Sequence, residues 1–98
     1  MAKNIDYPAL FSAVYHGLEP LVGQTNAFKY APGAVEVLVQ HRHVVGSGRK
    51  KPRPRQDAES NLSSYFKNET NVPDNYHTAV GVVDRLLRLG LVHLVDQR

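Results

Sequence analysis

A chain of 98 residues has room for one domain with a single modest hydrophobic core. It contains no cysteine, which excludes a disulfide framework and a thiolate metal site. No apolar stretch approaches the roughly 20 residues that a membrane-spanning helix needs, and the first residues lack the apolar run of a secretory signal. We therefore expect a single domain over residues 1–98, located in the cytoplasm and without a membrane segment.

The positive charge is concentrated in one segment of the chain. The net charge is +3, and six of the twelve basic residues lie between Arg42 and Arg55, where no acidic residue occurs. The rest of the chain has six basic and nine acidic residues. This distribution indicates a mildly acidic body that carries one strongly basic segment.

The first helix is expected over residues 6–18. Asp6 can cap it, and Pro8 suits a first helical turn. Apolar side chains recur every three or four residues and form one stripe. This stripe consists of Leu10, Phe11, Val14, Tyr15 and Leu18. Pro20 is expected to stop the helix, because proline breaks a helix interior.

The next segment mixes turn, strand and helix signals. Residues 23–26 predict a turn, residues 27–30 predict a short strand, and Ala31-Pro32-Gly33 predicts a break after it. Residues 34–45 fit two patterns. Alternating valines are typical of a strand, whereas Pro32 suits the first turn of a helix of about a dozen residues, and we prefer the helix.

Residues 46–56 (GSGRKKPRPRQ) predict a loop, because two glycines, two prolines and five positive charges do not form a packed element. Residues 57–67 predict a second helix with Leu62, Tyr65 and Phe66 facing inward. Residues 68–75 (NETNVPDN) predict a turn region.

The clearest unit is an amphipathic helix over residues 76–89. Asp74 or Asn75 can cap it, and one face is apolar. That face consists of Tyr76, Ala79, Val80, Val83, Leu86, Leu87 and Gly90, with Val82 and Leu89 flanking it. Gly90 predicts the helix end, and residues 91–95 (LVHLV) predict a strand. This strand needs an upstream partner, for which residues 27–30 are the candidate.

The stretch YHTAVGVVDRLLRLGLVHLV resembles the recognition helix of the winged helix–turn–helix superfamily and the strand that follows it. The family's frequent Leu-x-x-Leu-Gly-Leu-Val ending is matched by Leu86, Leu89, Gly90, Leu91 and Val92. The resemblance makes residues 57–90 a helix–turn–helix region, preceded by a first helix over residues 34–45 or 6–18. It implies a small helix-rich α+β domain of winged-helix type, with three to four helices and a short two- or three-stranded β element.

Two segments are candidates for contact with double-stranded DNA. In a recognition helix the early residues face base edges in the major groove. Hydrogen-bonding and basic side chains of the last helix suit that role. These are Asn75, His77, Thr78, Arg85 and Arg88. The basic loop suits phosphate contacts that weaken steeply with salt. Its candidates are Arg49, Lys50, Lys51, Arg53 and Arg55. The alternatives are a solvated helix face, which Asp84 favours, and a solubilising surface loop.

The sequence therefore predicts a DNA-binding protein of the transcription-regulator kind. A homodimer fits this prediction, because one such module binds weakly by itself. The alternative is a protein–protein interaction module of phage or mobile-element type, in which the basic loop would meet an acidic protein partner. His41 and His43 lack further metal ligands nearby in the sequence, and no nucleophile or carboxylate pair has catalytic spacing. We expect no enzyme, no cofactor and no metal.

Overall fold

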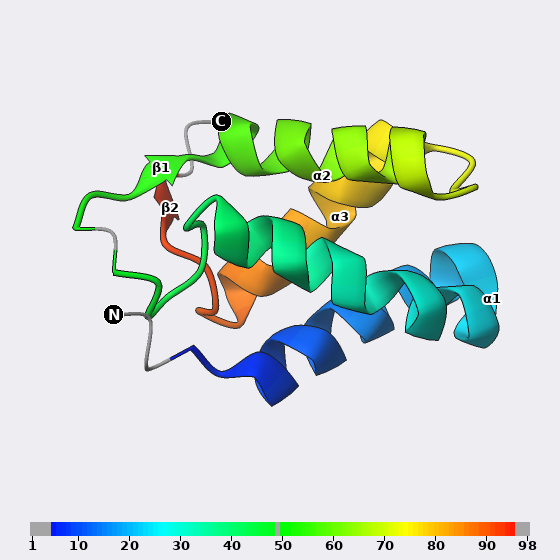
Figure 1. Cartoon of the computed structure of the whole chain (residues 1–98), viewed down its shortest axis with the longest axis horizontal. Coiled ribbons are helices and arrows are strands. Elements are labelled where there is room, and N and C mark those ends of the chain that lie inside the picture. Colours follow the sequence, from blue (N-terminus) through cyan, green and yellow to red (C-terminus); the bar gives the residue numbers. More distant parts are fainter. Residues whose placement is uncertain (1–4, 49, 96–98) are drawn as a thin grey trace.

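The computed structural model describes residues 5–48 and 50–95 and has three helices and two short strands (Figure 1). The helices are α1 (Tyr7–Gln40), α2 (Arg55–Glu69) and α3 (Asn75–Arg88). The strands are β1 (Arg53–Pro54) and β2 (Leu94–Val95). The described part of the chain is thus a small helix-rich α+β structure, as expected. None of its helices has the length and apolar character needed to cross a membrane.

Helix α1 folds back on itself at Gly23. The Asp6 carboxylate caps its start by accepting a hydrogen bond from the backbone N–H of Ala9 (3.1 Å). At Gly23 the backbone takes φ 86° and ψ 164°, a combination that is essentially limited to glycine. We refer to residues 7–22 as the first half of α1 and residues 24–40 as its second half. The two halves run in roughly opposite directions (Figure 1).

Three expectations for this region were wrong. The helix does not stop at Pro20, residues 27–30 are helical and not a strand, and Pro32 lies inside the helix. The preference for a helix after Pro32 is confirmed as far as Gln40. The physical reason is tertiary: the second half buries one continuous apolar stripe, which outweighs the local cost of its proline. This stripe consists of Ala27, Tyr30, Ala31, Ala34, Val35 and Leu38.

Helix α2 packs closely against the second half of α1 at Gly33. The Tyr65 hydroxyl donates a hydrogen bond to the backbone carbonyl of Tyr30 (3.1 Å). Its ring covers Gly33 so closely that any side chain there would overlap it. Burial, together with the nearby charge of Glu69, raises the pKa of Tyr65. Gly33 is therefore a contact point between helices and not the chain break that its position after Pro32 predicts.

The two helices of the proposed helix–turn–helix region form close to the predicted bounds. Asp74 caps α3, and its carboxylate accepts from the N–H of His77 (3.3 Å). The buried residues of α3 are Thr78, Ala79, Val82, Val83 and Leu86. The predicted inner stripe is thus confirmed in its centre, but Tyr76 and Gly90 are exposed. The apolar face of α3 is rotated towards Thr78 because α1 covers that side of the helix.

The last segment pairs with both ends of the basic loop. Val92 forms an antiparallel bridge with Val44, and β2 pairs in parallel with β1 in the register Arg53↔Leu94 and Pro54↔Val95. Residues 27–30 were the expected partner of this strand, but they are helical and cannot pair with it. A strand over 91–95 is confirmed only at Leu94–Val95, with the single bridge before it.

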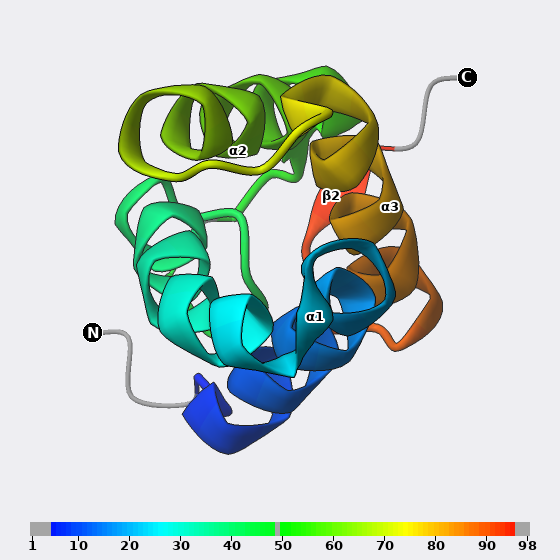
Figure 2. The same ribbon diagram turned by 90° about the vertical axis from the view of Figure 1, so that its right-hand side faces the viewer.

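The helical segments enclose one hydrophobic core. Figure 2 shows them in the order α2, α3, first half of α1 and second half of α1 around that core. The largest fully buried apolar side chains come from all three helices. They include Leu10, Leu18, Leu38, Leu62, Phe66 and Leu86. The first half of α1 lies against α3 where Gly17 faces Val82. This contact decides which face of α3 remains open to solvent.

Candidate nucleic-acid interface

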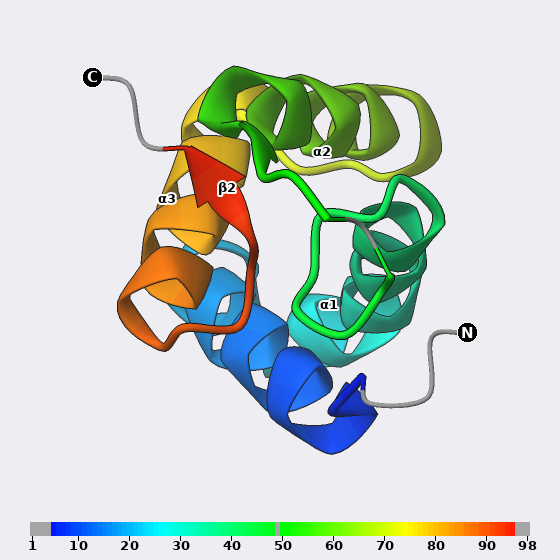
Figure 3. The same ribbon diagram turned by 90° about the vertical axis from the view of Figure 1, so that its left-hand side faces the viewer.

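The basic loop projects from a base that is held at both ends. The backbone N–H of His93 donates to the carbonyl of His43 (2.8 Å) before the loop, and the N–H of Arg53 donates to the carbonyl of His93 (3.3 Å) after it. The described part of this loop between Val45 and Pro52 lies at one end of the molecule, which faces the viewer in Figure 3. We call this the loop end. The C-terminal end of α3 lies at the same end, and its N-terminal end lies at the opposite one (Figure 1).

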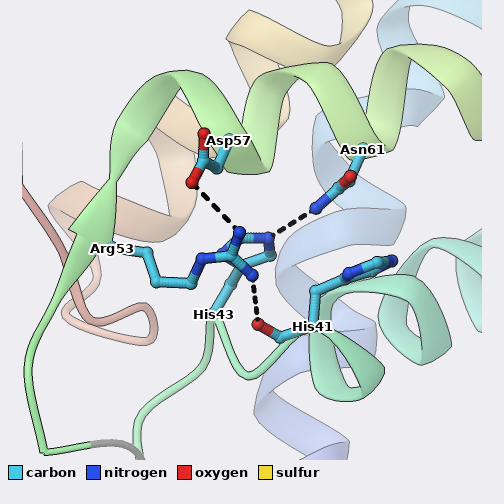
Figure 4. A network of polar contacts seen from close by, with 5 residues as sticks. All are labelled: His41, His43, Arg53, Asp57 and Asn61. Carbon is cyan, nitrogen blue, oxygen red and sulfur yellow. Dashed lines mark hydrogen bonds and ion pairs between the residues drawn. The ribbon is translucent and has the colours of Figure 1, made fainter.

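Arg53 folds back onto the protein (Figure 4). Its Nη1 donates to the backbone carbonyl of His41 (2.9 Å), and its Nη2 donates to the carboxylate of Asp57 (3.0 Å). These contacts join the end of α1 to the first turn of α2. Arg53 therefore fixes the exit of the loop, whereas the sequence predicted that it would contact DNA phosphates.

Arg55 is buried and is a structural residue. Its Nε donates to the Glu59 carboxylate (2.6 Å), and its Nη2 donates to the carboxylate of Asp84 on α3. Burial disfavours the charged guanidinium, but the hydrogen bonds to Glu59 and Asp84 outweigh this effect and raise the pKa of Arg55. The prediction that Arg55 contacts DNA was wrong, because a cation desolvated between two carboxylates is not available to phosphate.

His43 and Asn61 form a polar contact beside these arginines. His43 is fully buried, and 2.9 Å separates its Nε2 from Nδ2 of Asn61 (Figure 4). Its ring stacks against the ring of His41, with 5.9 Å between centroids. Within residues 5–48 and 50–95, no group of three or more His, Asp or Glu side chains could hold a metal ion. The sequence did not predict these buried polar contacts of His43 and Arg55. The one local signal for them is the i,i+4 spacing of Arg55 and Glu59.

The exposed cations of the loop end are Arg42, Lys50 and Lys51. None of them takes part in an ion pair among the described residues. Asp57 and Asp84 are paired with the two arginines described above. Among the described residues, no ion pair therefore compensates the charges of Arg42, Lys50 and Lys51. Arg49, another candidate, lies outside the described residues.

The candidates on α3 do not share one face. Thr78 is buried, with 3% of its surface exposed. Arg85 turns towards α1, where its Cδ lies against Gly17, and it lines a small hollow with Ser12 and Leu89. Contact of Thr78 with DNA is therefore ruled out by burial. Arg85 is largely covered by the first half of α1, which no pattern within α3 could reveal.

Three candidates on α3 remain accessible, at two different ends. His77 is exposed and contacts the Asp74 carboxylate (Nδ1–Oδ2, 2.7 Å), and hydrogen bonds from its side chain and backbone lower the pKa of Asp74. Asn75, beside it, accepts a hydrogen bond from Ser63 (3.2 Å). Arg88 is exposed at the other end of α3, where it borders a hollow with Arg55 and Asp84. About 20 Å of helix separates the two groups.

Comparisons with protein-family models, with curated proteins and with solved structures found no match.

Proposed function

We propose that this protein binds double-stranded DNA and that the loop end holds the phosphate backbone. One observation carries the proposal: Arg42, Lys50 and Lys51 are exposed and lack ion-pair partners among the described residues. Phosphate contacts by such cations release counterions from DNA, and this release supplies most non-specific affinity.

Helix α3 extends this surface through Arg88 and the neighbouring Gly81. A free carboxylate at Asp84 would repel phosphate, but Asp84 is paired with Arg55, which offsets part of its charge because Arg55 also pairs with Glu59. Gly81 is exposed and has open space around it, so the helix backbone can approach a groove closely there. In this proposal α3 contacts DNA through its outer face, with His77 at the far end.

A winged-helix type of architecture is part of the same proposal. The second half of α1, α2, α3 and a returning strand occur in the order that the resemblance implies, and the basic loop stands before α2. The returning strand pairs with the segments that flank the loop and not with a separate upstream strand. Because this pairing holds both ends of the loop, it supports a role for the loop as the projecting element of the interface. In this proposal the loop takes the place of a wing.

The test is the salt dependence of binding to a random-sequence duplex, measured by fluorescence anisotropy. The double variant Lys50→Gln/Lys51→Gln is expected to reduce the slope of log affinity against log salt by about two, since each lost phosphate contact removes about 0.9. Arg53 and Arg55 stay unchanged, because replacing them would disturb the fold and not only the charge.

Lys67→Gln is the matched control, because Lys67 is exposed on α2, outside the loop end. It should leave the slope unchanged. Absence of binding at about 50 mM salt, where phosphate contacts are strong, would refute the proposal. An equal loss of slope in the loop variant and the control would also refute the role of the loop.

A second candidate function is a protein–protein interaction module. It is favoured by an apolar groove between the two halves of α1, whose lining includes Tyr7 and Phe11. A pull-down from nuclease-treated lysate separates the candidates, since a protein partner remains bound after the nucleic acid is removed.

A further inference from the structure

The outer side of α1 carries an apolar groove between its two antiparallel halves. The groove has a volume of about 450 Å³. It is lined by Tyr7, Phe11, Pro32, Val35, Glu36, Val39 and Gln40. The lining residues come from both ends of α1 and meet only because the helix reverses at Gly23. Gln40 lies two residues before Arg42, so the groove adjoins the loop end, but none of Arg42, Lys50 and Lys51 lines it.

Aromatic side chains cluster beside this groove, and two of them, Tyr7 and Phe28, are exposed to solvent. Phe11 stacks on Tyr15, with 6.3 Å between ring centroids, and meets Phe28 edge to face at 5.8 Å. Phe28 is 66% exposed and Tyr7 is 50% exposed. Exposed aromatic side chains beside an apolar groove are typical of a contact surface. Aromatic residues are also enriched where protein partners bind.

The charges beside the groove specify its partner. Lys29 and Glu36 are both exposed and lie seven residues apart, two helical turns along the same side of the second half of α1. Their midpoint falls between Pro32 and Gly33. An antiparallel copy of the same helix, related by a twofold axis at this midpoint, places each Lys29 opposite the other chain's Glu36. Lys29 and Glu36 together carry no net charge, so this face does not suit the binding of a nucleic acid.

We infer that this protein forms a twofold symmetric homodimer through the outer face of α1. The second copy covers Phe28, Tyr7 and the groove, and two reciprocal Lys29–Glu36 pairs set the antiparallel orientation. A twofold interface uses the same patch on both subunits, so one self-complementary patch is sufficient. The inference does not depend on DNA binding.

The first test is the mass of the full chain by sedimentation equilibrium, over a concentration range that reaches about 100 µM, where a complex of micromolar Kd is formed. The expected mass is that of a dimer. Phe28→Ala should raise the dimer Kd by about tenfold or more, because the exposed ring is lost twice in the interface. Tyr76→Ala, which removes a half-exposed aromatic ring from α3, should leave the Kd unchanged.

The second test uses charge reversal and is independent of aromatic packing. Lys29→Glu and Glu36→Lys each place like charges opposite one another and should each raise the homodimer Kd by about tenfold. A mixture of the two variants restores opposite charges at both contacts and should form a heterodimer with near wild-type affinity. A wild-type chain that stays monomeric over the whole concentration range would overturn the inference. So would single variants that dimerise as tightly as their mixture.

Discussion

Basic side chains of the same segment have different roles, and the partners of each side chain decide which role it has. Arg53 and Arg55 lie within a few residues of Lys50 and Lys51, yet they are held by carboxylates whereas the lysines face solvent. Arg53 lies in β1, before α2. The Arg55–Glu59 pair has i,i+4 spacing within α2 and could be read from the sequence. The contact from Arg55 to Asp84 spans 29 residues and could not.

At this scale, removal of the Arg55 charge is expected to be strongly destabilising. Arg55→Met keeps most of the side-chain volume but removes the ion pair between Arg55 and Glu59, which is 2% exposed. Loss of one partner of a buried pair costs about 3–5 kcal/mol in the free energy of unfolding. Asp84→Asn should lower the free energy of unfolding by less than about 1 kcal/mol. The Asp84 side chain is half exposed, so solvent screens its pair with Arg55. Urea unfolding at neutral pH measures both values, and similar losses would contradict the assignment of Arg55 as a buried structural cation.

At the scale of the element, α1 departs most from local rules. Proline and glycine at 32 and 33 predict a break, but the buried stripe of the second half keeps that segment helical. The reversal occurs instead at Gly23, whose backbone conformation other residues rarely adopt. A predicted turn at residues 23–26 therefore located the reversal correctly, although it misjudged the structure on its C-terminal side.

Substitution of Gly23 tests this account of α1. Gly23→Ala is expected to reduce the free energy of unfolding by about 1–3 kcal/mol, the usual cost of a strained backbone conformation. The matched control is Gly17→Ala. Gly17 is helical, and an added Cβ would meet Val82 and Arg85 at an ordinary contact distance of 3.6 Å. That variant should be neutral or more stable by up to about 1 kcal/mol. Chemical denaturation of both variants provides the comparison, and an unaffected Gly23→Ala protein would contradict it.

At the scale of the whole molecule, the first half of α1 closes the core against α3. Its buried Leu10, Val14 and Leu18 complete the apolar interior that α2 and α3 begin. The same packing covers Thr78 and most of Arg85, so it also determines which part of α3 is accessible. Stability and the shape of the candidate interface are therefore linked through one contact.

This shared core predicts one cooperative unfolding transition. Far-UV circular dichroism reports on all the helices, whereas tyrosine fluorescence is dominated by α1 and α2, because Tyr7, Tyr15, Tyr30 and Tyr65 lie there. The two signals should give coincident urea transitions with a slope of about 1 kcal/mol per molar urea. Separate midpoints would mean that the first half of α1 unfolds independently of the core.

The sequence by itself determined the helix-rich class, the exposed cations at Lys50 and Lys51, a cap at Asp74 or Asn75 and the central apolar stripe of α3. These features depend on composition and on spacing within a few residues, which act locally. Only the tertiary structure decided the burial of Thr78, Arg55 and His43, and the strand partner of Leu94–Val95. Each of these depends on which distant segment packs against it. The reversal at Gly23 sets that arrangement by placing the first half of α1 against α3.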